Sequence, residues 1–378
     1  MSAAGLPRVV FVAGMHRAGT SAVARALAAL GVDLGERLMS ADVRQNARGF
    51  FEDVDVVALD DALLAAHGAD WKSVALLDDV DWGAAALAPR AAAARALLAA
   101  RTARCATFGC KDPRMARALP FWQHACADTG LADAYVVAVR HPRAVVDSLT
   151  ARDALDPRRS AWLWLTHVAC ALRYTQGRRR VVVDYDRLLE APARELARMA
   201  AALGLPPPAE AAARDYAEGF LSAELRHARY DAADVNPAGV PPLVPAAHAL
   251  AQRLARGDSD PGAPAVREEI DALFARLRAF SPLLAYAAAA ERAADDVPRL
   301  SGELAWARES LASAGAWNED LRATVGRKEA EMRDARAYNE DLAATVARKD
   351  AELVAAHATL ARLSERALGR MLLKRIRG

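Results

Sequence analysis

Short apolar runs that alternate with Ala-rich stretches constrain the fold of this chain more than any other feature. The clearest runs are RVVFVAG (8–14), YVVAVR (135–140) and RVVVDY (180–185), and CATFGCK (105–111) is a weaker fourth. Strands have this continuous pattern when helices cover both faces of a parallel sheet. The segments between them, such as 20–30, carry apolar residues at helical spacing. We therefore predict an α/β fold with a doubly wound parallel sheet.

Composition narrows the function only slightly. Of the 378 residues, 53% are hydrophobic and 26% are charged, and the net charge of +2 does not suggest wholesale nucleic-acid binding. No stretch approaches the ~20 apolar residues of a membrane span, and the N-terminus lacks a signal-peptide pattern, so we expect a cytoplasmic protein. The cysteines fit neither a disulfide framework nor a paired zinc site. They are Cys105, Cys110, Cys126 and Cys170.

Three parts of the chain differ in composition. The alternating pattern occupies residues 1–230. The second part, 231–292, contains NPAGVPPLVP and GDSDPGAP, where Pro and Gly are dense enough to break both helices and strands. We predict a linker or overlying loop there, followed by a helix over 265–292. The third part, 293–378, predicts a helix from about Leu300 to Leu363 with a heptad pattern.

The third part also contains an internal duplication. WNEDLRATVGRKEAE, from Trp317, recurs 21 residues later as YNEDLAATVARKDAE, from Tyr338, and this offset equals three heptads. The pattern predicts a coiled coil and hence a homodimer. Apolar residues fill most of the a positions of one register. They are Leu304, Leu311, Val325, Met332, Val346, Leu353 and Leu360.

Polar residues at heptad positions leave the coiled-coil prediction open to an alternative. Asn318 and Asn339 at a positions favour an in-register dimer over higher oligomers. Lys328 and Lys349 at d positions instead favour a single solvated helix. The tail GRMLLKRIRG combines an apolar cluster with basic residues, which predicts at most a weak contact with an anionic membrane surface. Its basic residues are Arg370, Lys374, Arg375 and Arg377.

The sequence GMHRAGTS (14–21) follows the first predicted strand and precedes a predicted helix. A Gly-rich turn before a helix N-terminus forms an anion cradle, because free N–H groups point inward and the helix dipole favours negative charge. Arg17 adds a fixed positive charge, and Ser21 adds a hydroxyl. The motif is not a good Walker A, since Thr20 stands after Gly19 where an NTPase has Lys.

A second motif, VAVRHPRAVVDSL, places Arg140 at the end of a predicted strand and Ser148 in the next helix. Arg140 is then at the carboxyl edge of the sheet, where open α/β folds bind ligands. An Arg fork and a hydroxyl are both suited to a phosphate. A surface Arg and a helix-interior Ser are the alternative interpretation.

Together these motifs resemble those of sulfotransferases that use 3′-phosphoadenosine-5′-phosphosulfate (PAPS). The order basic–small–Gly–Thr–Ser is similar to the family's 5′-phosphosulfate loop, and Arg140 with Ser148 is similar to its 3′-phosphate motif. The resemblance covers Arg8 to about Tyr230, and is closest to bacterial and, in some motifs, tyrosylprotein sulfotransferases. It implies a P-loop-type fold, PAPS as co-substrate, no metal, and a hydroxyl acceptor, for which a saccharide is our first expectation. The implied donor-binding residues are Gly14, Arg17, Ala18, Gly19, Thr20, Ser21, Arg140, Ser148, Tyr185, Arg226 and His227.

The last three of these residues have weaker support. VVVDYDRLLEAP resembles a family strand that ends in a Tyr–acidic pair, so that Tyr185 contacts the adenosine end of the donor. A Tyr that merely packs on the next helix fits equally well. FLSAELRHARY resembles the basic loop that closes over the nucleotide, with Arg226 and His227 as donors. A solvated helix face is the alternative for Arg226.

Sulfuryl transfer needs a base for the acceptor proton and cations for the leaving oxygen. Glu52, in the loop NARGFFED, is the predicted base, because two neighbouring Phe residues favour desolvation and a raised pKa. Asp53 is the alternative base. The KDP tripeptide resembles that of tyrosylprotein sulfotransferases, which implies that Lys111 stabilises the leaving oxygen together with Arg17. A surface ion pair between Lys111 and Asp112 is the competing interpretation.

The remaining polar residues near these motifs are less informative. Asp112 and Arg114 are assigned to the acceptor site without separate roles. His16 either caps the cradle or faces solvent, and no His, Cys and carboxylate cluster predicts a metal site. A kinase or NTPase with Asp184 as Mg²⁺ ligand is one rival function. A coiled-coil adaptor that merely binds nucleotide is the other.

Overall fold

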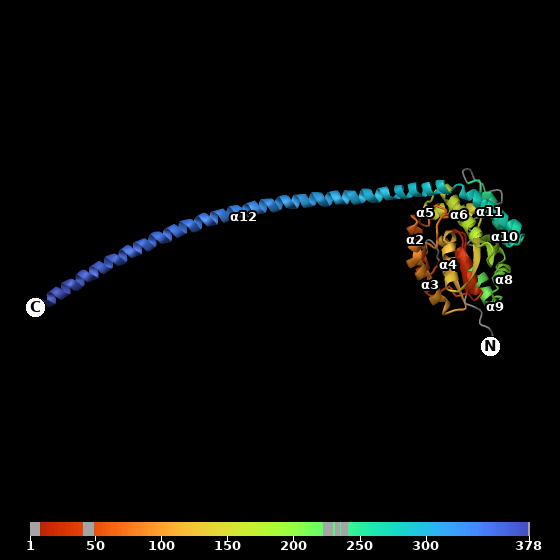
Figure 1. Ribbon diagram of the computed structural model, residues 1–378, viewed down its shortest axis with the longest axis horizontal. Coiled ribbons are helices and arrows are strands. Elements are labelled where there is room, and N and C mark those ends of the chain that lie inside the picture. Colours follow the sequence, from red (N-terminus) through yellow and green to blue (C-terminus); the bar gives the residue numbers. More distant parts are fainter. Residues whose placement is uncertain (1–7, 41–48, 222–229, 231–234, 236–240, 377–378) are drawn as a thin grey trace. The chain divides into compact units, whose positions relative to one another are not determined.

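Four parallel strands form the sheet of the chain (Figure 1). A computed structural model describes residues 8–40, 49–221, 230, 235 and 241–376, with side chains masked at 368, 369 and 371–376. Within this part the strand order is β2-β1-β3-β4, and every pair is parallel. The predicted apolar runs all form strands. They are β1 (Arg8–Ala13), β2 (Thr107–Lys111), β3 (Ala132–Val139) and β4 (Arg180–Asp184).

Helices cover both faces of the sheet. Successive side chains of a strand point to opposite sides, and in these strands the side chains on both sides are apolar. Val10 and Val12 of β1 join one apolar cluster, with α1 (Thr20–Ala29), α7 (Tyr185–Glu190) and α8 (Pro192–Leu203). Val9 and Phe11 join the other cluster. The predicted doubly wound α/β fold is therefore confirmed. The second cluster draws on α2 (Val54–Ala66), α3 (Ala88–Thr102), α4 (Leu119–Asp128), α5 (Pro142–Asp153), α6 (Pro157–Tyr174), α10 (Val244–Arg256) and α11 (Pro264–Arg278).

The strand order places a topological switch point between β1 and β3. The chain passes from β1 to β2 on one side, and then crosses back over β1 to reach β3 on the other. Loops at the carboxyl ends of two strands diverge at such a point and leave room for a ligand. The residues that follow β1 and β3 are therefore the first place to look for a site.

The segment expected to be a linker or loop, 231–264, contributes the helix α10 to the fold. α10 carries buried Val244, Leu250 and Leu254 and packs against β4 and α6, so this part of 231–292 belongs to the apolar core. Its Pro245 lies in the first turn, where a proline is tolerated. The helix predicted over 265–292 is also interrupted, because α11 ends at Arg278 and α12 (Ser281–Ile376) begins after a short break.

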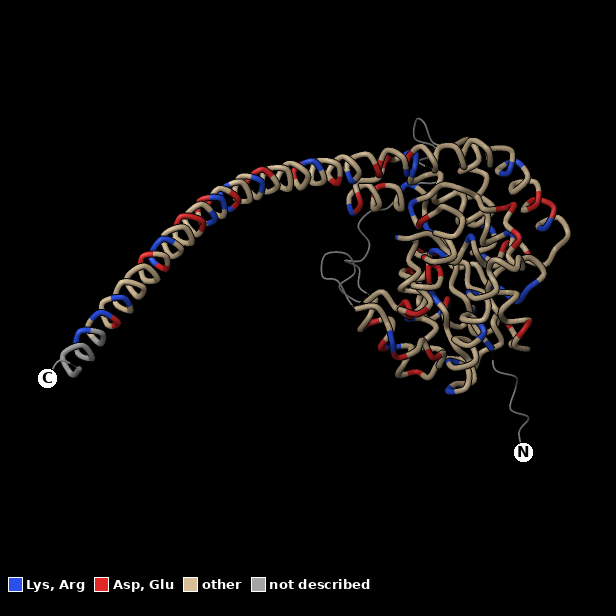
Figure 2. Tube along the Cα trace, turned by 60° about the vertical axis from the view of Figure 1, so that its left-hand side comes forward, with Lys and Arg blue, Asp and Glu red and all other residues tan. Residues whose placement is uncertain are grey.

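The chain divides into two compact units, Met1–Ala293 and Ala294–Gly378. The predicted helix over 300–363 is confirmed, since all of it lies within α12. Basic and acidic residues are interspersed along α12 (Figure 2). In its described part after Ala293, the large apolar side chains of α12 are exposed, including Leu311 at 75% and Leu360 at 63%. No helix among the described residues is both long and apolar enough to cross a membrane.

Candidate functional site

The turn between β1 and α1 is built around two glycines in tight contact with other elements. A Cβ on Gly14 would lie 2.5 Å from the Ala138 carbonyl oxygen of β3, so a side chain there would displace the strand. Gly19 has a φ of 86°, and its Cβ would lie 2.2 Å from Cδ2 of Tyr185. α1 then begins at Thr20, and Gly19 provides no side chain to cap its first turn. This is the anion-binding arrangement of a helix N-terminus.

The predicted phosphate-binding residues meet at this turn. Arg17 Nε donates to Ser148 Oγ at 2.8 Å, and Arg140 Nη1 donates to the Arg17 carbonyl oxygen at 3.2 Å. The Arg140 guanidinium lies 4.7 Å from the ring centroid of Tyr185. Trp164 Nε1 holds the Arg140 carbonyl oxygen at 3.0 Å. Residues from the turns that follow β1 and β3, from α5 and from the start of α7 thus converge at the switch point.

Positive charge accumulates at Arg17. Burial, followed by the cations Arg152 and Arg140, lowers the pKa of the Arg17 guanidinium. Three guanidinium groups that repel one another favour an anion in their vicinity. Arg17 also has a φ of 68°, a left-handed backbone conformation that a non-glycine residue rarely adopts. Such backbone strain is typical of functional sites.

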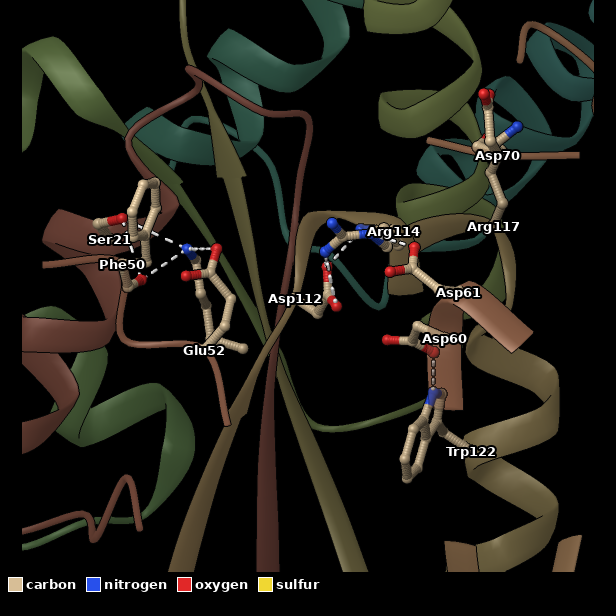
Figure 3. Close-up of polar contacts among 11 residues, drawn as sticks. Ser21, Phe50, Glu52, Asp60, Asp61, Asp70, Asp112, Arg114, Arg117 and Trp122 are labelled. Atoms are coloured by element: carbon tan, nitrogen blue, oxygen red, sulfur yellow. Dashed lines mark hydrogen bonds and ion pairs between the residues drawn. The ribbon is translucent and has the colours of Figure 1, made fainter. Parts of the chain in front are cut away.

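A buried ion pair joins the cradle to the predicted base (Figure 3). Lys111 Nζ, at the end of β2, donates to Glu52 Oε1, to the Phe50 carbonyl oxygen at 2.8 Å and to Ser21 Oγ at 3.3 Å. Only 2% of the Lys111 side chain and 5% of the Glu52 side chain are exposed. The alternative of a surface ion pair between Lys111 and Asp112 is therefore not what the structure contains.

The protonation of this pair depends on burial. Burial raises the pKa of Glu52 and lowers the pKa of Lys111, and the attraction between the two groups opposes both shifts. Glu52 Oε2 is buried and accepts no hydrogen bond from any described residue. Glu52 therefore keeps one oxygen that can accept a proton.

Asp53, the alternative base, is engaged elsewhere. It caps α2 by accepting from the Asp55 N–H at 2.9 Å, and it pairs with Arg101 Nε at 2.7 Å. Its carboxylate therefore links α2 to α3.

Phe51, which directly precedes Glu52, has a φ of 59° and packs edge-on against Phe220.

A second group of charged residues follows β2 (Figure 3). Asp112 is buried and accepts from the Arg114 N–H at 2.9 Å and from its Nη1 at 3.0 Å, and Arg114 Nε lies 2.7 Å from Asp61. Asp60 accepts from Trp122 Nε1 at 2.8 Å. Burial, followed by repulsion from Asp112, raises the pKa of Asp60 well above its usual range. The sequence prediction missed Asp60, although a paired Asp in an otherwise apolar helix is a readable signal.

His16 does not face solvent. Its ring lies 4.7 Å from that of Trp71, a residue that the sequence prediction missed, and it is half-buried. Burial and the cations Arg114 and Arg152 lower the pKa of His16 well below its usual range. His16 is therefore a neutral side chain beside the cradle at physiological pH.

Asp184, the residue a rival function needs as a metal ligand, has other partners. Its Oδ1 caps α7 by accepting from the Arg187 N–H at 3.0 Å, and its Oδ2 accepts from Gln252 Nε2 at 2.7 Å. In the described part of the chain, no group of three or more His, Cys, Asp or Glu residues is arranged to hold a metal. Several predicted residues lie outside the described residues or side chains. They are Arg226, His227, Lys374, Arg375 and Arg377.

Comparison with known proteins identifies one family. A model of the sulfotransferase family matches residues 7–209, more than half of the chain. Among solved structures, the sulfotransferase domain of the Synechococcus PCC 7002 olefin synthase is similar at 18% sequence identity and a TM-score of 0.35. The similarity covers 72% of this chain and 95% of that domain. No curated protein matches the chain.

Proposed function

Because the chain belongs to the sulfotransferase family, we propose that it transfers the sulfuryl group of PAPS to a hydroxyl of a saccharide. One observation carries the proposal. The cradle after β1, the cations Arg17 and Arg140, and the buried pair of Lys111 and Glu52 meet at one edge of the sheet. A binding site for two phosphate groups and a sulfate needs this concentration of donors and positive charge.

The donor's parts are assigned to different residues of this edge. The N-terminus of α1, with Thr20 and Ser21, holds the phosphosulfate, because its N–H groups and dipole favour an anion. Arg140 and Ser148 hold the 3′-phosphate by charge-assisted hydrogen bonds. Tyr185, whose ring already packs against Gly19 and Arg140, lies against the adenosine. No metal is needed where guanidinium and ammonium groups neutralise the charge.

Glu52 and Lys111 divide the chemistry of the transfer. Glu52 Oε2 accepts the proton of the acceptor hydroxyl as its oxygen forms the new bond to sulfur. The bond between sulfur and the bridging oxygen breaks, and its electron pair stays on that oxygen. Lys111 and Arg17 stabilise the negative charge that develops there. The products are the sulfated acceptor, 3′-phosphoadenosine 5′-phosphate (PAP) and a proton on Glu52.

The buried ion pair is suited to this division. A carboxylate in a desolvated site is a stronger base than one in water, and the raised pKa of Glu52 reflects this. Lys111 also touches Ser21 Oγ in the first turn of α1. The Lys111 ammonium thus contacts both the cradle, where the negative charge develops, and the base Glu52.

The rival functions have less support from the same residues. A P-loop kinase needs a Lys after Gly19 and a carboxylate for Mg²⁺, but Thr20 stands at the first position and Asp184 binds Arg187 and Gln252. A nucleotide-binding adaptor has no need of a buried Lys111–Glu52 pair, since a charged pair in the interior gives little net stability.

A thermal-shift comparison distinguishes the enzymes. We expect PAP to raise the melting temperature without Mg²⁺, and ATP with Mg²⁺ to have little effect. Incubation with PAPS carrying ³⁵S and a saccharide mixture should then label the acceptor. Stabilisation by ATP with Mg²⁺ but not by PAP would support the kinase. Stabilisation by PAP with no transfer to any hydroxyl would support the adaptor.

A further inference from the structure

The order of the strands separates the donor from the acceptor. Arg140 and Tyr185 follow β3 and β4, on one side of β1. Lys111 is the last residue of β2 and Arg114 follows it, on the other side. If the nucleotide occupies the β3 and β4 side, as the proposed function requires, the acceptor must reach the cradle from the β2 side. The residues on that side are therefore candidates for acceptor recognition.

A loop on the β2 side is fixed by a buried arginine. Arg117 is fully buried in the 3-10 helix η2 (Pro113–Arg117), near Asp70 (Figure 3). It donates to the carbonyl oxygens of Asp70 at 2.7 Å, Ser73 at 2.6 Å and Ala75 at 3.1 Å. It forms no ion pair with a carboxylate in the described part of the chain, and burial lowers its pKa to about 10. Burying a cation without a carboxylate partner lowers the free energy of unfolding. Arg117 therefore fixes the loop over 70–75 at a cost in stability.

Trp71 lies at the centre of this loop and next to the cradle. Its ring meets that of His16, which directly precedes Arg17. Lys72 Nζ lies 5.5 Å from the Trp71 ring centroid, and the Arg152 guanidinium lies 5.6 Å from it. Arg159 Nε holds the Lys72 carbonyl oxygen at 3.0 Å. An indole with two cations therefore lies beside the position of sulfuryl transfer.

The charge of this group is not balanced. Arg152 pairs with Asp153 at 2.7 Å, but Lys72 makes no ion pair with any described residue. His16 is neutral and contributes no charge. The anions of the donor have Arg17, Arg140 and Lys111 as partners. The ammonium of Lys72 is thus left for a different anion.

We propose that Trp71 and Lys72 bind the acceptor, and that the acceptor is an acidic saccharide. The indole ring provides an apolar surface for the C–H face of a sugar, and the Lys72 ammonium provides a partner for its carboxylate. The proposal rests on the proposed function, because it assumes that the donor fills the other side of the edge. It adds the class of the acceptor and the residues that select it.

A pair of probes that differ only in the carboxylate tests this proposal. p-Nitrophenyl β-D-glucuronide and p-nitrophenyl β-D-glucoside should be titrated into the PAP-saturated full-length protein by calorimetry. We expect the glucuronide to bind at least tenfold more tightly, as a charge-assisted hydrogen bond gives. Lys72→Met should bring the ratio of the two affinities close to one. Trp71→Ala should weaken both probes at least tenfold, and Trp71→Phe should restore most of that loss.

Lys328→Met provides the matched control, because it removes the same charge from an exposed position of α12. It should leave the ratio of affinities unchanged. Equal binding of the probes, binding of neither probe, or a preference that survives Lys72→Met would each overturn the proposal while PAP still binds. If the unmodified protein does not bind PAP, the proposed function itself is overturned. Melting curves of each variant establish that it is folded.

Discussion

Lysine and glutamate meet in both units of this chain, and the two settings have opposite consequences. At the edge of the sheet the pair of Lys111 and Glu52 is almost fully buried. Along α12, Lys328 pairs with Glu331 and Lys349 with Glu352, and each of these side chains is at least 57% exposed. An exposed pair contributes up to about 0.5 kcal/mol, whereas the loss of one partner from a buried pair costs about 3–5 kcal/mol.

The comparison shows that the environment of a Lys–Glu pair, rather than its residue types, decides how strongly the two groups affect each other. At the exposed pairs of α12, water and salt screen their attraction. At the sheet edge the same groups have shifted pKa values, and Glu52 Oε2 has no hydrogen-bond partner among the residues that the structure describes. The apolar residues show the same contrast, since they pack together in the α/β unit and are exposed along the described part of α12 after Ala293.

The sharpest test of the contrast is Glu52→Gln. If the buried carboxylate is the base, turnover should fall by about 10²-fold or more, because the amide cannot accept the proton. PAP affinity should stay nearly unchanged. Sulfation kinetics and calorimetry with PAP measure the two quantities. Near-normal turnover would remove Glu52 from the reaction. Asp53→Asn is the control, and it should affect the melting temperature more than turnover, since Asp53 caps α2.

Arg140→Ala and Ser148→Ala extend the test to the donor side of the edge. Each should weaken PAP binding by about 1.5–3 kcal/mol, the range for a charge-assisted hydrogen bond. Ser148 acts partly through Arg17, because its Oγ accepts a hydrogen bond from Arg17 Nε. Calorimetry gives the affinities, and circular dichroism checks the fold. If both variants bind PAP as tightly as the unmodified protein, the 3′-phosphate lies elsewhere.

Asp60 tests whether burial alone makes a group sensitive to pH. Its folded pKa is raised, so the folded state holds a proton that the unfolded state releases above the ordinary carboxyl pKa. Stability should therefore fall as pH rises through the window between the two values, by at most about 1.4 kcal/mol per pH unit. Asp60→Asn should remove this dependence in urea unfolding measured across pH. A slope shared by both proteins would assign it to another group.

Deletion of everything after Asp295 separates the two regions. We propose that α12 forms an in-register coiled-coil dimer, because its heptad stripe is exposed and the α/β unit buries its own core. The shortened protein should be an active monomer, with turnover close to that of the full chain. Asn318→Leu with Asn339→Leu should strengthen association but relax its stoichiometry. Light scattering decides: a full-length monomer at tens of micromolar contradicts the dimer.

The smallest effect is expected where the contrast predicts none. Glu331→Gln and Glu352→Gln should each change the free energy of unfolding by less than about 0.5 kcal/mol, because each removes only one exposed ion pair. Sulfation rates should not change. Urea unfolding measures the difference. A loss of more than about 1 kcal/mol would mean that these ion pairs are not exposed in solution.

How far the sequence alone predicts this molecule depends on the range of the interactions. The strands and the cradle are local patterns, and the structure has them where the apolar runs and the Gly-rich turn predicted. The loop at Trp71 depends on Arg117, more than 40 residues later, and no local pattern reports that contact. The sequence does not predict α10, because the prolines in and before it favour a linker, although Pro245 occupies the first turn of the helix. The cap at Asp53 was readable, since an Asp before an apolar helical run is a known start signal.

The left-handed backbone of Arg17 and Phe51 has a consequence for the history of this sequence. Glycine would adopt both conformations without the penalty of about 1 kcal/mol or more that an L side chain incurs. Random mutation under selection for folding alone would therefore drift toward glycine at both positions. A requirement for turnover would keep the guanidinium of Arg17 and the ring of Phe51, which directly precedes Glu52. Laboratory evolution for thermostability without an activity screen should then replace these two residues by glycine early, with a loss of turnover.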